Sequence, residues 1–153
     1  RQRQMCTRDR LRPVAEALVV EMGGEPVWVD EQQRGLYHAA LAFGANHLMT
    51  LVSQTVALLK EAGVSAPETL AVPLLTASLD NALRNGDQGL TGPVVRADVE
   101  TIKVHLTMLH SIEPGLAQVY RALARLTAER ALASGQLRAD DASRLIQILG
   151  EPC

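Results

Sequence analysis

One stretch of the sequence, YHAALAFGANHLMT at residues 37–50, combines an apolar composition with side chains that could do chemistry. It is rich in Ala, Leu, Phe and Met, as a buried helix should be, yet it carries His38, Asn46 and His47. At about 100° per residue, one arc of roughly 100° holds His38, Ala42, Ala45, Asn46, Met49 and Ser53. His38 and Asn46 are then about 12 Å apart along the axis, and His47 lies on the opposite side of the helix.

This stripe has two interpretations. Ala42 and Ala45 lie between the polar residues and leave a groove that a ligand, a cofactor ring or another helix can approach closely. Asn46 could donate and accept hydrogen bonds there, and His38 could transfer a proton or hold an oxyanion. Alternatively, both side chains bond to a loop or set the register of a dimer. Spacing alone favours this packing role.

A second segment, GLTGPVVRADVETIKVHL at residues 89–106, could complete a site. Thr91, Gly92 and Pro93 predict a turn at which a ligand can approach the backbone closely. Arg96 precedes a helix capped by Asp98, a position suited to clamping a carboxylate or phosphate. The alternative, commoner for a single Arg, is a surface pair with Asp98 or the following Glu.

Other polar residues carry less weight. His105 and His110 are expected to be surface or cap residues, and Tyr120 and Arg121 packing and solvated residues. No HExxH, CxxC or ExxH pattern occurs, so we expect no metal. No G-x-G-x-x-G, P-loop, G-x-S-x-G or kinase signature occurs either. We therefore expect this chain alone to bind no dinucleotide.

The elements that must position these residues are mostly helical. Periodicity, caps and breakers predict helices over residues 10–22, 31–62, 66–83, 98–109, 114–133 and 140–149. The long helix spans roughly 30 residues, or about 45 Å, which suits the centre of a bundle or a dimer seam. We expect a multi-helix bundle built around it.

One strand is predicted, over residues 26–29 in EPVWVD. A lone strand has nothing to pair with. It would be the last αβ step of an α/β domain, or it would pair with a copy of itself in a dimer. Because the chain begins with Arg rather than Met, we expect it to be part of a longer protein.

Composition narrows the class of protein. The 153 residues are 47% hydrophobic and 21% charged, typical of a soluble globular protein. A net charge of −2 argues against a nucleic-acid partner. No apolar run approaches the roughly 20 residues of a membrane span, and no signal peptide is evident. The chain has two cysteines, Cys6 and Cys153, too few for a secreted disulfide framework. We expect free thiols in the cytoplasm, and the alternative is a disulfide between the two.

Two motifs carry a family resemblance. The stretches GGEPVWVDEQQRGLYHAALAFGANHL and LTGPVVRADVETIKVHL resemble a family of uncharacterised two-domain proteins. In that family a Rossmann-like domain precedes a helical domain of unknown function, which is similar to the C-terminal domains of 6-phosphogluconate dehydrogenase and its relatives. The resemblance covers nearly the whole chain from about Leu11.

The resemblance implies two parts. Residues 1–29 would be the tail of the Rossmann-like domain, and residues 30–153 the helical substrate-binding and dimerisation domain. Ketopantoate reductases, pyrroline-5-carboxylate reductases and β-hydroxyacid dehydrogenases share this layout. It further implies a homodimer, and NAD or NADP bound by the parent protein, with substrate held against the nicotinamide.

The family's site residues match positions in this chain. By resemblance, Asn46 would orient the substrate's oxygen and His38 would donate or accept a proton. Thr91, Gly92, Pro93 and Arg96 would bind the substrate, with Arg96 holding an anionic group. The implied substrate is a small 2-oxo or 2-hydroxy acid.

The chain departs from the family pattern in two ways. Ala97 stands where Gly is common, which implies a stiffer loop, and the stripe lacks the Lys that β-hydroxyacid dehydrogenases use. Their mechanism therefore does not transfer directly. The competing hypothesis is a dimeric helical scaffold without catalysis, which binds a protein partner or a regulatory ligand along the long helix.

Overall fold

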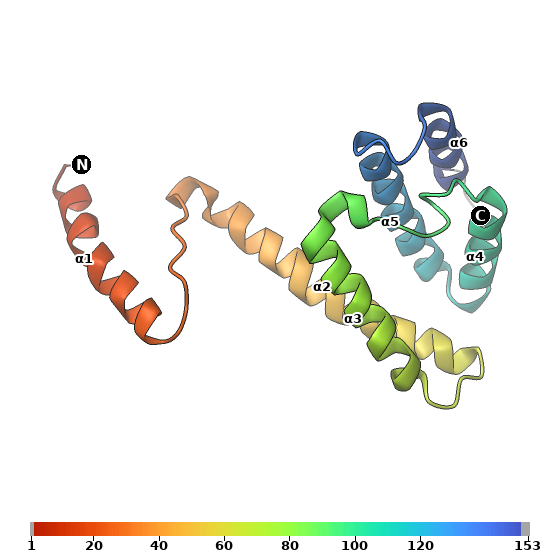
Figure 1. Cartoon of the computed structure of the whole chain (residues 1–153), viewed down its shortest axis with the longest axis horizontal. Coiled ribbons are helices and arrows are strands. Elements are labelled where there is room, and N and C mark those ends of the chain that lie inside the picture. The colour runs from red at the N-terminus through yellow and green to blue at the C-terminus, as the bar shows by residue number, and fades with distance from the viewer. Residues whose placement is uncertain (1, 151–153) are drawn as a thin grey trace. The chain divides into compact units, whose positions relative to one another are not determined.

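The computed structural model describes the backbone of residues 2–150 (Figure 1). Side chains are described for residues 11–150. In that part the chain is helical, which confirms the mostly α prediction. The elements are α1 (Gln2–Glu21), η1 (Glu31–Gln33), α2 (Arg34–Glu61), α3 (Pro67–Asn85), η2 (Gly86–Gly89), α4 (Val99–Ile112), α5 (Pro114–Ala133) and α6 (Ala139–Gly150). They form two compact units, divided after Glu61. The alternative of a disulfide between Cys6 and Cys153 falls outside the described side chains.

The strand expected over residues 26–29 is not formed. Residues 24–30 have no regular secondary structure, and the described part contains no other strand with which they could pair. Side chains hold this segment to α1 instead. The indole Nε1 of Trp28 donates a hydrogen bond to Glu16 Oε1 at 2.7 Å, and the Arg12 guanidinium lies 4.6 Å from the centre of the Trp28 ring. The preceding helix begins at Gln2, earlier than the predicted residue 10.

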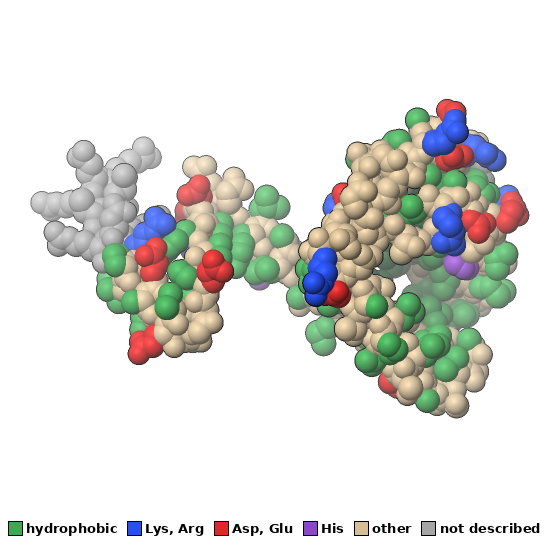
Figure 2. All heavy atoms as spheres, in the orientation of Figure 1, with side chains coloured by type: hydrophobic (Ala, Val, Ile, Leu, Met, Phe, Trp, Pro, Cys, Tyr) green, Lys and Arg blue, Asp and Glu red, His purple; other side chains and the backbone are tan. Residues whose placement is uncertain are grey.

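The long helix forms as predicted, after one 3-10 turn. Between Arg34 and Lys60, α2 contains no Asp, Glu, Lys or Arg, and none of its residues is buried. Apolar side chains remain exposed along it, among them Leu36 at 69%, Phe43 at 62% and Met49 at 73%. Apolar side chains accordingly reach the visible surface of the chain in Figure 2. A helix without charges on any face is normally enclosed by other elements.

The core of the second unit is built around α5. Small residues on α5 let α4 and α6 pack closely against it, and this face carries the buried alanines Ala117, Ala124, Ala128 and Ala131. From α4, Ile102 and Leu106 contribute larger side chains, and Leu145 of α6 is fully buried. The small residues of α5 and the larger ones of α4 and α6 together form one buried cluster.

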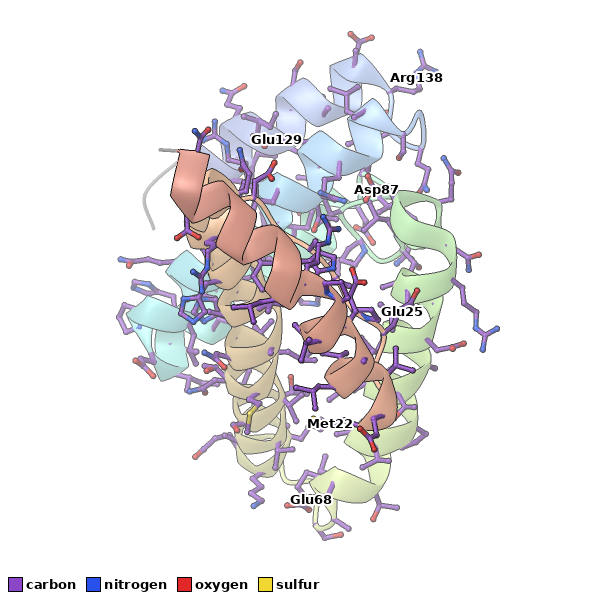
Figure 3. All side chains as sticks on the ribbon, turned by 90° about the vertical axis from the view of Figure 1, so that its left-hand side faces the viewer. Met22, Glu25, Glu68, Asp87, Glu129 and Arg138 are labelled. Carbon is purple, nitrogen blue, oxygen red and sulfur yellow. The ribbon has the colours of Figure 1, made fainter. Side chains whose placement is uncertain are left out.

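Polar contacts fasten the turn η2 to the end of α5. Arg130 Nε donates to Asp87 Oδ1 at 2.7 Å, and Gln136 Nε2 donates to the Asp87 carbonyl oxygen at 2.7 Å. Figure 3 labels Asp87 in this turn. Asn81 of α3 donates through Nδ2 to the Gly89 carbonyl oxygen at 2.8 Å. These bonds fix the start of the loop that leads from η2 to α4.

Candidate functional site

The predicted binding loop is a single helical turn inserted between η2 and α4. Three backbone hydrogen bonds close it, from Arg96 N to Gly92 O at 3.2 Å, from Ala97 N to Val94 O at 3.1 Å and from Asp98 N to Pro93 O at 2.8 Å. Val94 is buried in the core and anchors the turn. The side chain of Arg96 is exposed, so the loop presents a cation to solvent from a fixed backbone.

Ala97 gives this turn an unusual backbone. The bonds from Asp98 to Pro93 and from Ala97 to Val94 are the 6→1 and 5→2 pair of a Schellman motif, which requires a left-handed residue at Ala97. Its φ is +53°, a value that a residue with a Cβ atom seldom adopts. This residue turns the chain so that Asp98 can begin α4 directly after the loop.

Asp98 caps α4, as predicted from the sequence. Its Oδ1 accepts a hydrogen bond from Thr101 N at 3.1 Å, and its Oδ2 accepts one from Thr101 Oγ1 at 2.7 Å. These hydrogen bonds, helped by the charges of Arg96 and His105, hold the pKa of Asp98 below its ordinary value. The neighbouring Glu100 pairs with Lys103 Nζ at 2.9 Å.

The α2 stripe lies at the surface of the first unit. His38 and Asn46 are both exposed, and the helix continues unbroken from Arg34 to Glu61. His47 makes an edge-to-face contact with Phe43, with ring centres 5.5 Å apart. The stripe and the loop belong to different compact units. Their combination into one site stays a prediction.

The sequence interpretation missed a histidine–tyrosine pair in the second unit. His105 was expected at the surface, but it is half-buried, and its Nδ1 lies 2.9 Å from the Tyr120 hydroxyl. Burial raises the pKa of Tyr120 above its ordinary value, because the charged phenolate loses contact with water. In the sequence, His105 adjoins the buried Leu106 of α4, and Tyr120 follows the buried Ala117 of α5 by three residues. These positions were the available signal that both side chains are partly buried.

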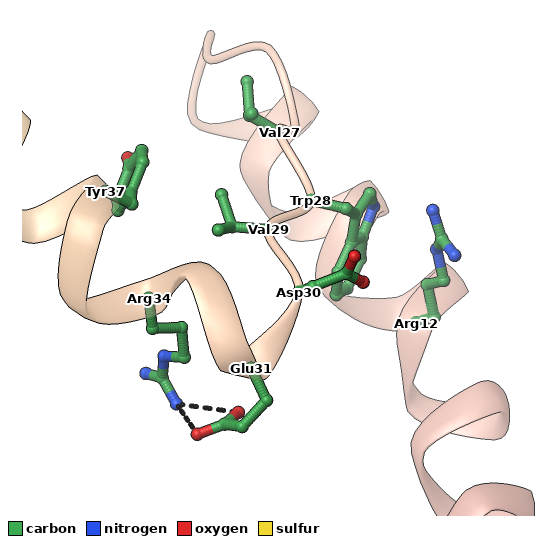
Figure 4. Close-up of a pocket in the computed structure, with 8 residues that line it drawn as sticks. All are labelled: Arg12, Val27, Trp28, Val29, Asp30, Glu31, Arg34 and Tyr37. Carbon is green, nitrogen blue, oxygen red and sulfur yellow. Dashed lines mark hydrogen bonds and ion pairs between the residues drawn. The ribbon is translucent and has the colours of Figure 1, made fainter.

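A cleft in the first unit was also missed. Its volume is about 470 Å³. It lies between α1, residues 24–30 (the extended segment) and the start of α2 (Figure 4). Its lining combines Trp28 and Tyr37 with charged side chains. The sequence signal was the alternation of Val and polar or aromatic residues in VWVD, which was interpreted only as a strand. Among the described residues, no three His, Cys, Asp or Glu side chains are grouped so that they could hold a metal ion.

The sequence model of one protein family, described as "Domain of unknown function (DUF2520)", matches residues 6–127. This range includes both the α2 stripe and the loop. The chain belongs to this family. No match was found among curated proteins or among solved structures. The DUF2520 match ends within α5, so α6 lies outside it although its Leu145 is part of the core. Within residues 2–150, none of the helices combines the length and apolarity that a membrane span requires.

Proposed function

We propose that this DUF2520 chain is the substrate-binding and dimerisation part of an NAD(P)-dependent oxidoreductase acting on a small oxo or hydroxy acid. The observation that carries the proposal is α2 itself. His38 and Asn46 share one face of a 28-residue helix that is otherwise apolar or uncharged through its middle. A proton-transferring imidazole and an amide are the groups that a carbonyl-to-hydroxyl conversion needs beside the hydride donor.

Each residue has a role in this proposal. Asn46 orients the substrate's oxygen, and His38 donates or accepts the proton. Arg96 holds the substrate's carboxylate, and the turn at Thr91–Pro93 lets the substrate approach the backbone. The exposed Arg96 on a loop tied into the core supports a fixed anion contact, because little ordering of the backbone remains to be done on binding.

The cofactor belongs to another part of the parent protein. This chain has no Gly-rich turn between a strand and a helix, and the described residues form no strand, so they do not fit a dinucleotide. We assign NAD or NADP to a Rossmann-like domain that precedes this chain in the parent protein. The cofactor would supply the hydride chemistry, and this chain would bind and orient the substrate.

The dimerisation role rests on the exposed surface of α2. A helix with no charge between Arg34 and Lys60 and no buried residue exposes apolar area that water disfavours. We infer that a second copy covers part of it and that the bundle assembles around this helix. Light scattering of the full-length protein should give a dimer, and a mass of one copy at high concentration would contradict this role.

The same helix supports a second candidate. An uncharged, exposed seam is also what a non-catalytic dimeric scaffold would present to a protein partner or a regulatory ligand. In that case His38 and Asn46 would be packing residues at an interface. The two candidates differ in whether Asn46 responds to a small acid.

The test is an NADPH fluorescence titration on the full-length protein with a panel of small 2-oxo acids. Wild type is compared with Asn46→Ala and with Gln54→Ala, a matched control because Gln54 is exposed on α2 but lies outside the stripe. The proposal predicts an acid-dependent change that is lost in Asn46→Ala and kept in Gln54→Ala. No cofactor binding, or equal responses in both variants, would favour the scaffold.

A further inference from the structure

The cleft in the first unit carries a binding chemistry that the proposed substrate site does not use. Its volume of about 470 Å³ falls within the range of small-molecule sites. Its α2 residues are Arg34 and Tyr37, and neither His38 nor Asn46 lines it.

The aromatic side of the cleft is held in place before any ligand arrives. Glu16 accepts the Trp28 indole hydrogen bond, and Arg12 lies over the ring, yet 49% of Trp28 remains exposed. Tyr37 is 47% exposed and lines the same cleft from α2. In Figure 4, Val29 projects toward Tyr37, on the other side of the extended segment from Trp28. Trp28 therefore offers a fixed aromatic surface in this cleft.

Among the described side chains at or next to this cleft, three carboxylates face two guanidinium groups. Arg12 Nε pairs with Glu16 Oε1 at 3.2 Å, and Arg34 Nη1 pairs with Glu31 at 3.3 Å. Asp30 adds a third carboxylate to these two ion pairs, and its side chain makes no capping hydrogen bond to the turn that follows it. Asp30 and Trp28 line the same cleft and are two residues apart in the chain. Aromatic faces next to an acidic group favour an organic cation.

We propose that this cleft binds a small organic cation, a primary amine with an aromatic or apolar body. The ammonium group contacts the Asp30 carboxylate, and the body of the ligand contacts the Trp28 ring. An anionic ligand would have to displace Glu31 from Arg34 or Glu16 from Arg12, and it would meet Asp30 at the same time. The cleft therefore prefers a cation, whereas the proposed acid site at Arg96 prefers an anion.

Trp28 is the single tryptophan of the 153-residue chain, so intrinsic fluorescence reports on this cleft directly. We would titrate the chain with benzylamine, benzyl alcohol and benzoate, which share a ring but differ in charge. The expected result is a saturable change with benzylamine and much weaker responses to the other two probes. Asp30→Asn should weaken benzylamine binding about tenfold, the loss of one charge-assisted contact.

Glu25→Gln is the matched control, because it removes the same charge from the same exposed segment but does not line the cleft. It should bind benzylamine as wild type does, and circular dichroism should show equal helix content in both variants. Benzoate binding more tightly than benzylamine, no saturable response, or equal affinities of Asp30→Asn and Glu25→Gln would each overturn the proposal. The titration needs no cofactor, so its outcome is independent of the proposed oxidoreductase role.

Discussion

Replacing Ala97 by Gly should stabilise the second unit, although the change removes a methyl group. The same pair of backbone bonds closes three turns in the described chain. At two of them the left-handed residue is a glycine, Gly23 with φ +78° and Gly135 with φ +77°. At the third it is Ala97 with φ +53°. The turn before α4 therefore carries a steric cost that the other two avoid.

The expected magnitude follows from three terms. The left-handed conformation costs a residue with a Cβ atom roughly 1–2 kcal/mol. Glycine offsets about 0.4–1 kcal/mol of this gain in stability, because it loses more conformational freedom than alanine on folding. The half-buried Ala97 methyl group contacts the core, and its loss costs about 0.4 kcal/mol, half the value of a fully buried CH₂. The net effect is a stabilisation of about 0.5 kcal/mol.

A matched substitution makes the sign decisive. Ala122 is an exposed residue inside α5, where Ala122→Gly should destabilise by about 1 kcal/mol, since glycine is a poor helix former. Each substitution removes one methyl group, but Ala97→Gly should raise the free energy of unfolding and Ala122→Gly should lower it. The two effects should differ by about 1.5 kcal/mol.

Urea unfolding followed by circular dichroism, together with hydrogen exchange of the α4 and α5 amides, would measure both variants in the full-length protein. Exchange reports on the second unit even if the two units unfold separately. If Ala97→Gly lowers stability as much as Ala122→Gly does, the left-handed residue is not strained and the reasoning fails.

Three further predictions concern the second unit. Asp98 stabilises the fold above its ordinary pKa of 3.8 and loses that contribution as pH falls through its lowered pKa. Asp98→Asn keeps a capping oxygen but does not titrate, so it should make unfolding less dependent on pH below about pH 4 in a circular dichroism titration. An unchanged pH dependence would contradict this prediction. Because the pKa of Tyr120 is raised, its contribution is complete below its ordinary pKa of 10.0 and is lost as pH rises through the raised value. Tyr120→Phe should therefore reduce alkaline destabilisation, while the lost bond to His105 costs about 0.5 kcal/mol at neutral pH in urea unfolding; equal alkaline sensitivity of the two proteins would refute this. Leu145→Ala should cost about 2–5 kcal/mol in the same assay, since Leu145 is fully buried, and the exposed Leu132→Ala should cost much less.

The sequence alone predicted where the helices form, although α1 begins earlier than expected, because helix limits depend largely on neighbouring residues. Pro114 opens α5, and Asp98 caps α4 through Thr101, both as predicted. Apolar periodicity without a breaker likewise predicted the long helix over residues 31–62. Proline geometry, capping bonds and apolar periodicity act within about one or two turns of chain, so a sequence displays them directly.

The tertiary structure decided what depends on distant partners. Residues 26–29 have the composition of a strand, but a strand exists only where another strand pairs with it, and the described chain offers none. The pairing of His105 with Tyr120 depends on how α4 packs against α5, and the cleft beside Trp28 depends on the contact with Glu16 of α1. The candidate residues could be chosen from sequence because their types and spacing are local. Their exposure, and the neighbours that each one meets, follow from packing between segments far apart in the chain.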